Sequence, residues 1–133
     1  MDEPVVLSDL QITLMRVLWQ RQTATTAQVV QDMRATRPIA HTTVATLLTR
    51  LEKRGLVAAE RQGRELNYSA LVSESAVRQS MVSSMLSNLF DGQASALLSH
   101  LLKRDQIQPA DLERMRELLA SQGGKNSKGV RHD

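Results

Sequence analysis

The sequence contains no cysteine, which excludes disulfide bonds, thiolate metal sites and cysteine nucleophiles together. A chain without cysteine is compatible with a reducing compartment, and we expect a cytoplasmic protein. Aromatic residues supply only 2% of the chain, although 41% of it is hydrophobic. The core must therefore consist mainly of Leu, Val, Met and Ala side chains, which favour helices, so a mainly α-helical fold is expected.

Long hydrophobic runs are also missing. No apolar stretch approaches the roughly 20 residues of a membrane-spanning helix. The first ten residues, MDEPVVLSDL, are acidic, whereas a signal peptide starts with basic residues. We therefore expect a soluble protein without membrane insertion. The net charge of +3, from 17 basic and 14 acidic residues, is too small by itself to indicate a polyanionic partner.

Motifs for catalysis are absent from the sequence. It has no Walker loop and no dinucleotide-binding fingerprint, and His41, His100 and His132 lie too far apart for a local metal motif. No serine between Ser69 and Ser87 stands in a context typical of an activated nucleophile. The sequence therefore predicts no enzymatic activity, no cofactor and no metal site.

Two helix starts precede residue 40. The Ser-x-x-Gln pattern that begins at Ser8 resembles a capping box, so a first helix is expected from Ser8 to about Gln20. A second helix is expected to start at Thr25 or Thr26 and to end before Pro38, which cannot continue it.

The third expected helix has two distinct faces. It opens near His41 and stops at Gly55, a residue type that suits the left-handed conformation after a helix. Apolar residues recur at the spacing of a buried helical stripe, at Val44, Leu47, Leu48 and Leu51. At about 100° per residue, the opposite side carries Thr42, Thr46, Thr49 and Lys53, flanked by Arg50 and Arg54.

Three threonines on an exposed face weaken a helix, because Thr is β-branched. Their short side chains suit a helix that enters the DNA major groove, since Thr donates or accepts a hydrogen bond and its methyl packs on a thymine methyl. Arg50, Lys53 and Arg54 are placed for phosphate contacts. The pattern favours DNA binding, with an ordinary solvent-exposed helix face as the alternative.

The residues after Gly55 predict a β-hairpin. A polar turn at Gln62-Gly63 is followed by alternation through Leu66 and Tyr68. Arg61 and Arg64 flank this turn and make its tip basic. Three helices followed by a two-stranded hairpin is the element order of a winged helix-turn-helix DNA-binding domain, which we assign to residues 1–72.

Residues 73–122 are expected to form three further helices, broken at Asp91-Gly92, with the last one starting at Pro109 and ending at Gly123-Gly124. Their apolar faces need a partner, and we predict a helical dimerisation domain in a homodimer, with folding back onto the first domain as the alternative. Residues 123–133 are expected to be a disordered polar tail. The predicted dimerisation residues are Val77, Met81, Met85, Leu89, Phe90, Leu97, Leu98, Leu101, Leu102, Leu112, Met115 and Leu119.

The segments LSDLQITLMRVLWQ, HTTVATLLTRLEKRGLV and LNYSAL resemble the BlaI/MecI-type penicillinase repressors, from about Leu7 to Leu119. The resemblance implies a homodimeric transcriptional repressor that binds a palindromic operator in double-stranded DNA and controls β-lactamase or related resistance genes. It implies DNA contacts from the third helix and a wing that carries Arg61 and Arg64. The residues carried over to the third helix are His41, Thr42, Thr43, Ala45, Thr46, Thr49 and Arg50.

Two positions separate this sequence from familiar members of that family. Their induction involves proteolysis at an Asn-Phe bond, downstream of a membrane β-lactam sensor, and the similar bond here is His100-Leu101. Ala45 stands where those repressors have a longer side chain, which suggests a different operator. Two alternatives stay open: a ligand-sensing winged-helix regulator with an effector pocket between the DNA-binding domain and the dimer helices, and a winged-helix protein-interaction module that does not bind DNA.

Overall fold

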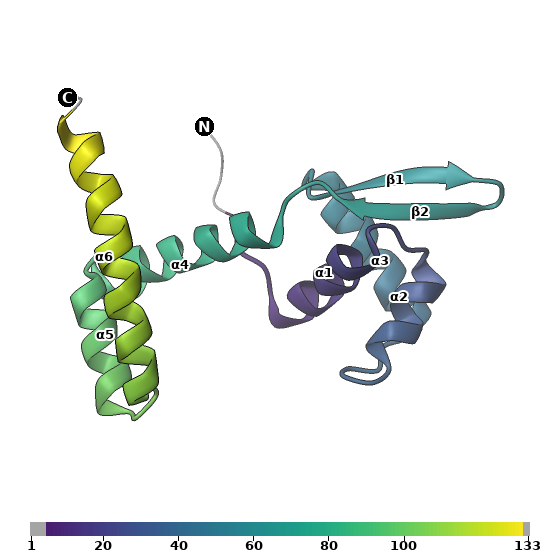
Figure 1. Ribbon diagram of the computed structural model, residues 1–133. Coiled ribbons are helices and arrows are strands. Elements are labelled where there is room, and N and C mark those ends of the chain that lie inside the picture. The colour runs from purple at the N-terminus through teal and green to yellow at the C-terminus, as the bar shows by residue number, and fades with distance from the viewer. Residues whose placement is uncertain (1–4, 132–133) are drawn as a thin grey trace. The chain divides into compact units, whose positions relative to one another are not determined.

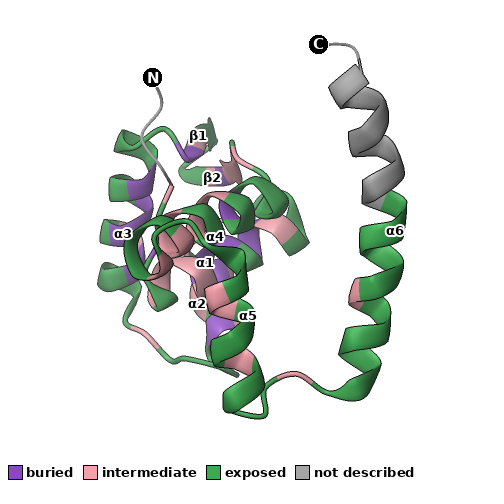
Figure 2. Cartoon of the chain, turned by 90° about the vertical axis from the view of Figure 1, so that its left-hand side faces the viewer, coloured by how far each residue is buried: buried purple, intermediate pink, exposed green. Residues whose placement is uncertain are grey.

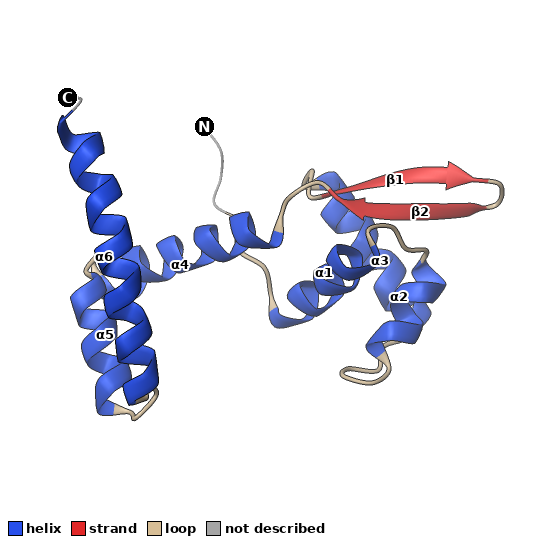
Figure 3. Cartoon of the chain, viewed as in Figure 1, coloured by secondary structure: helices blue, strands red, loops and turns tan. Residues whose placement is uncertain are grey.

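The computed structural model describes the backbone of residues 5–131 and the side chains of residues 5–121. The chain divides into two compact units, Met1–Met85 and Leu86–Asp133. Within the described residues, no helix is long and apolar enough to cross a membrane. The elements, shown in Figures 1 and 3, are α1 (Asp9–Arg21), α2 (Thr26–Met33), α3 (His41–Lys53), β1 (Val57–Gln62), β2 (Glu65–Ala70), α4 (Glu74–Phe90), α5 (Ala94–Lys103) and α6 (Pro109–Arg131).

Capping boxes fix the starts of α1 and α2. The Ser8 hydroxyl accepts a hydrogen bond from the Gln11 backbone N–H at 3.2 Å, and the Gln11 side-chain oxygen accepts one from the Ser8 N–H at 2.9 Å. Thr25 and Gln28 form the same reciprocal pair, with distances of 3.2 and 2.9 Å. Both helix starts predicted from the sequence are confirmed.

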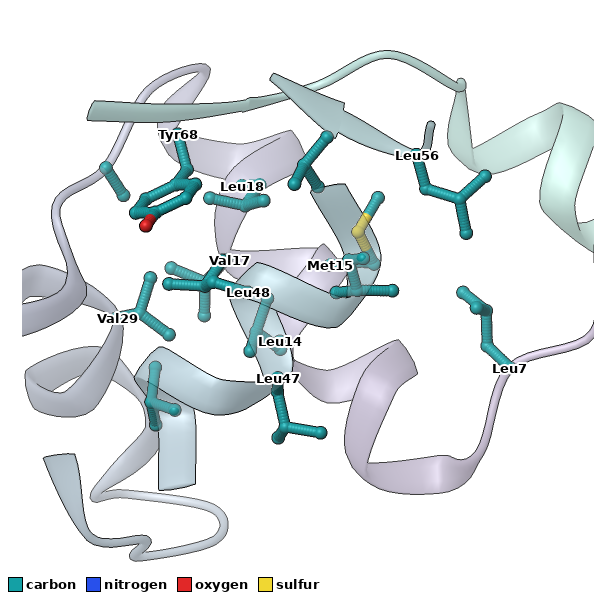
Figure 4. Close-up of a cluster of buried hydrophobic side chains, with 14 of the residues drawn as sticks. Leu7, Leu14, Met15, Val17, Leu18, Val29, Leu47, Leu48, Leu56 and Tyr68 are labelled. Carbon is teal, nitrogen blue, oxygen red and sulfur yellow. The ribbon is translucent and has the colours of Figure 1, made fainter. Parts of the chain in front are cut away.

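The core of the first unit consists almost entirely of aliphatic and Met side chains from all of its elements. Figure 4 shows them converging, with Val29 and Tyr68 toward one end of the cluster and Leu7 and Leu56 toward the other. Full burial of one such side chain contributes about 1.5–3 kcal/mol relative to leaving it in water. The predicted apolar stripe of α3 is confirmed, because it is buried at Val44, Leu47, Leu48 and Leu51.

The hairpin is antiparallel, and its register corrects the predicted turn. Gln62 pairs with Glu65, so the two-residue turn is Gly63-Arg64, one residue later than predicted. Gly63 has φ +64°, which suits the first turn position of a type II′ hairpin. The predicted turn is wrong because a polar residue at the end of a strand resembles a turn residue, and Gln62 is the last residue of β1. Arg64 therefore lies within the turn, at the tip of the wing.

A short bridge that the sequence did not reveal anchors the hairpin to the helices. Ala24, between α1 and α2, exchanges two backbone hydrogen bonds with Tyr68 on β2, at 2.9 and 2.8 Å. The Trp19 indole N–H also donates to the backbone oxygen of Val72 at 2.8 Å. These bonds fix the base of the wing relative to α1. The fold of the first unit is a winged helix, as predicted.

Most of α4, from Glu74 to Met85, belongs to the first unit, whereas the sequence predicts a boundary after residue 72. Val77 is only 3% exposed and lies in the core of this unit. Its assignment to a dimer surface is therefore corrected. The physical reason is that apolar spacing identifies the buried face of a helix but not the surface that covers it.

Of the helix boundaries predicted after residue 73, two agree with the structure and a third differs. Asp91 and Gly92 adopt positive φ angles of 51° and 76° directly after α4, and α6 starts at Pro109. However, α6 does not stop at Gly123-Gly124 and runs to Arg131, into the segment predicted to be disordered. Glycine inside a helix costs about 1 kcal/mol relative to alanine, which weakens a helix without forbidding it. Residues 132–133 of that segment lie outside the described residues.

Candidate nucleic-acid interface

The face of α3 opposite its core stripe is exposed. His41, Thr42, Thr43, Thr46 and Thr49 are all open to solvent, and the small Ala45 among them is half-buried. Figure 2 shows α3 with buried and exposed stretches alternating along its length, as expected for a helix with one face on a core. Thr42, Thr46 and Thr49 thus lie opposite the core stripe, and His41 and Thr43 lie on its two flanks.

Two of the threonines already donate their hydroxyl protons to the helix. Thr46 Oγ1 donates to the Thr42 backbone oxygen and Thr49 Oγ1 to that of Ala45, each at 3.0 Å. A hydroxyl oxygen that donates its one proton still has lone pairs that accept. In this state Thr46 and Thr49 present an acceptor oxygen and a methyl group to any molecule on this face. They do not present a free donor.

The N-terminal end of α3 has no side-chain cap. Its N-cap residue is Ala40, which forms no capping hydrogen bond, in contrast to Ser8 of α1 and Thr25 of α2. The first backbone N–H groups of α3 are therefore without the partner that a capping side chain supplies. Such groups, together with the positive end of the helix dipole, suit contact with an acceptor or an anion such as a DNA phosphate.

Basic side chains on α3 and the wing are available for phosphate contacts. Arg50, Lys53, Arg61 and Arg64 are exposed, and none takes part in an ion pair within the described part of the chain. Arg54 differs, because its guanidinium donates a long hydrogen bond of 3.5 Å to the backbone oxygen of Val6. Arg54 is thus directed toward the N-terminal segment, and its predicted phosphate contact is the least supported of the set.

Sequence reasoning missed two arginines at this surface. Arg34 and Arg37 are exposed in the segment that joins α2 to α3, and Arg34 lines a shallow hollow together with His41 at the start of α3. The sequence feature that could have indicated them is a pair of basic residues in the segment that connects the two helices of a helix-turn-helix. Arg34 brings positive charge to the uncapped end of α3.

An ion pair joins α2 to α1. Arg21, the last residue of α1, binds Asp32 of α2 through two hydrogen bonds of 2.6 and 3.0 Å. The hydrogen bond from the Arg21 guanidinium holds the pKa of Asp32 below its ordinary value. Because both ends of the pair are on helices that pack against the core, it supports the orientation of the helix-turn-helix.

All of the predicted dimerisation residues in the second unit are at least partly exposed. Leu89 and Leu119 are 72% and 71% exposed, and Leu98, Leu102 and Leu112 are also exposed. Phe90, Leu97, Leu101 and Met115 are half-buried, as are Met81 and Met85 in the first unit. No residue of α5 is buried. A unit with so little core and so many exposed leucines has apolar area available for a partner.

The predicted cleavage bond lies inside a helix. His100 and Leu101 are both within α5, and the His100 backbone oxygen accepts a hydrogen bond from the Arg104 N–H at 3.2 Å. The His100 ring packs edge-on against Phe90, with ring centroids 6.3 Å apart. A protease that needs an extended substrate must first open this part of α5.

Comparison with known proteins shows that this chain is similar to repressors. A family model described as "Penicillinase repressor" matches residues 7–121. The "Penicillinase repressor" of Bacillus licheniformis is 25% identical over 113 residues, which cover 85% of this chain and 88% of that protein. The "Methicillin resistance regulatory protein MecI" of Staphylococcus aureus strain N315 is 20% identical over 113 residues, with 85% and 92% covered. The solution structure of the DNA-binding domain of the repressor BlaI matches with a TM-score of 0.50 and 28% identity, over 57% of this chain and 93% of that domain.

Proposed function

The chain belongs to the penicillinase repressor family, and on this premise we propose that it represses transcription by binding a two-fold symmetric operator as a homodimer. The observation that carries the proposal is the two-sided α3. Its apolar stripe is buried in the winged-helix core, and its opposite face presents threonines beside basic side chains that form no ion pair in the described part of the chain. A helix of this kind fits the major groove, where short side chains meet base edges and cations meet phosphates.

Base reading by α3 follows from the hydrogen bonds of its threonines. Because Thr46 and Thr49 donate to the helix backbone, their oxygens are left to accept from the amino groups of adenine or cytosine. Their methyl groups, with that of Ala45, suit contact with the thymine methyl. Ala45 has no hydrogen-bonding group in its side chain, so apolar contact or close approach is its role in this proposal.

Phosphate contacts come from both sides of α3. Arg50 and Lys53 bind the backbone along the helix, and Arg61 and Arg64 bind it, or the adjacent groove, from the wing. Arg34 adds charge at the start of α3. Each phosphate neutralised releases counterions, so operator binding weakens as salt rises.

The homodimer forms through the second unit, whose exposed leucines bury each other across the interface. In a two-fold symmetric dimer, two copies of α3 reach half-sites separated by one or more turns of about 10 base pairs. The relatives named above regulate penicillinase and methicillin resistance, and we infer resistance genes of that kind as targets. Access to that DNA implies a cytoplasmic protein.

Release from the operator is proposed to follow the family route, in which a membrane sensor or protease pathway leads to cleavage at His100-Leu101. Since the bond lies inside α5, cleavage requires local opening of that helix. A chain cut there keeps Ala94–His100 of α5 and loses the rest of that helix and all of α6 from the dimerisation unit.

Recovery of genomic fragments bound by the full-length protein tests the function directly. Sequencing should yield a two-fold symmetric site upstream of repressed genes, and its affinity should fall steeply between low and physiological salt. Arg50→Gln should reduce the slope of log affinity against log salt by about one unit, whereas Arg114→Gln, an exposed charge on α6, should leave the slope unchanged. No retention of DNA at low salt would favour a protein-interaction module and overturn the proposal.

A further inference from the structure

A groove between α1 and α4 lies wholly within the first unit and takes no part in the α3 surface. Its volume is about 230 Å³. Five of its lining side chains are apolar, with an aromatic ring among them: Ile12, Trp19, Val77, Met81 and Val82. Pockets for drug-sized ligands measure about 300–1,000 Å³, so this groove suits a smaller molecule.

Hydrogen bonds on either side hold the walls of the groove in place. The Trp19 indole N–H donates to the Val72 backbone oxygen at 2.8 Å, just before α4 begins. Further along α4, the Ser80 hydroxyl accepts a hydrogen bond from the Val5 N–H at 2.7 Å. Val77, between these two points, is 3% exposed. The groove is therefore preformed, which lowers the cost of binding.

The charged residues of the groove favour an anion. Arg16, Glu74 and Arg78 complete the lining. Glu74 already engages Arg78, with a separation of 3.5 Å between the guanidinium nitrogen and the carboxylate oxygen. Arg16 has no such partner within the described residues. The lining thus has one guanidinium in excess, and a planar guanidinium matches the geometry of a carboxylate.

We propose that this groove binds a small carboxylate with a single aromatic ring. The ring packs against Trp19 and the aliphatic wall, and the carboxylate pairs with Arg16. α4 starts in the first unit and continues into the second, so a ligand that contacts both α1 and α4 favours particular positions of α4. If α4 connects the groove to the dimer interface, binding of the carboxylate in the groove changes the affinity of the protein for its operator. This regulatory part rests on the function proposed above.

Trp19 makes the binding step directly measurable, because it is the one tryptophan of the sequence. Titration of the full-length protein with benzoate, without DNA, should change its fluorescence in a saturable way. Benzamide, which has the same ring without the charge, should bind about tenfold more weakly, and so should benzoate to the Arg16→Gln variant. Arg16→Lys should recover part of the affinity, and Arg114→Gln should bind as the unaltered protein does. The same benzoate titration of N-acetyltryptophanamide is the control for collisional quenching of the indole.

The outcomes separate this site from the proposed function. Absence of saturable binding overturns the site, whatever the operator titration shows. A change in Trp19 emission that depends on protein concentration but not on benzoate also overturns the site, because a second copy of the chain then covers the groove. If benzoate binds and changes operator affinity in the unaltered protein but not in Arg16→Gln, the regulatory role is supported. Binding without any effect on operator affinity overturns that role and leaves the site.

Discussion

The threonines of α3 show how the single proton of a hydroxyl group limits the hydrogen bonds that the residue can form with another molecule. Thr46 donates its proton to Thr42, so replacement of the hydroxyl by a methyl removes one hydrogen bond inside the helix and one acceptor on its surface. We predict that Thr46→Val changes the ranking of operator variants more than the affinity for random DNA. Arg50→Gln should weaken binding to both by a similar factor, because a phosphate contact carries no sequence information.

A panel of operators with single base changes, titrated with both variants and with random DNA as reference, measures this contrast. Replacing thymine by uracil in the same operators isolates the methyl contact, since uracil differs only by its missing methyl. Parallel behaviour of Thr46→Val and Arg50→Gln across the panel would contradict the assignment of base and phosphate contacts.

The Arg21–Asp32 pair gives the fold a dependence on acid. The pKa of Asp32 is lowered in the folded protein, so its contribution to stability is complete above the unfolded value of about 3.9 and is lost as pH falls through the lower folded value. We predict that Asp32→Asn lowers the melting temperature modestly near neutral pH and that the difference from the unaltered protein shrinks below about pH 4.

Thermal unfolding from neutral to acidic pH checks this prediction. Glu60→Gln offers a matched control, because Glu60 is exposed on β1, away from any helix end, and forms no ion pair in the described residues. A stability difference between Asp32→Asn and the unaltered protein that stays constant with pH would show that the pair does not act through the charge of Asp32.

At the scale of elements, the end of α3 depends on backbone conformation and hardly on contacts. Gly55 has φ +79°, and a Cβ placed there meets no atom within 4 Å. Gly55→Ala should therefore destabilise the protein by about 1 kcal/mol through backbone strain alone. Gly55→Asn should cost less, because Asn tolerates the left-handed region. Chemical denaturation measures both, and equal losses would argue against strain as the cause.

Elements with local causes were predictable from the sequence, and those with distant causes were not. The starts of α1 and α2 follow from residues three apart, and the core stripe of α3 from helical spacing. The bridge between Ala24 and Tyr68 joins two residues far apart in sequence, and the alternation that places Tyr68 on a strand does not show that Ala24 pairs with it. The turn of the wing was placed one residue early because a polar residue at the end of a strand resembles a turn residue.

The same limit appeared in the candidate site. The exposed threonines and the wing arginines were found from helical and strand periodicity. Periodicity could not show that Thr46 and Thr49 donate to their own helix, that Arg54 is directed toward Val6, or that Val77 is buried in the first unit. Each of these depends on which neighbour the side chain meets in three dimensions.

At the scale of the whole molecule, repression in the proposed function depends on coupling two DNA-binding units. Linking two half-site contacts raises the affinity for a full operator through effective concentration, without any new contact to DNA. The second unit supplies this link in the proposed function, and its exposed Leu89 and Leu119 are the side chains with most apolar surface to lose in an interface. Charge at these positions should oppose dimerisation, because a carboxylate buried without a partner is costly.

We predict that Leu89→Glu combined with Leu119→Glu shifts the protein from dimer to monomer in analytical ultracentrifugation. Affinity for the full operator should fall by about 10²-fold or more, while affinity for an isolated half-site should be retained, because α3 and the wing are unchanged. Leu71→Glu is the matched control, since Leu71 is a similarly exposed leucine, 61% open to solvent, in the first unit. A monomeric double variant that binds the full operator as tightly as the unaltered protein would contradict coupling through the second unit, and so would a double variant that stays dimeric.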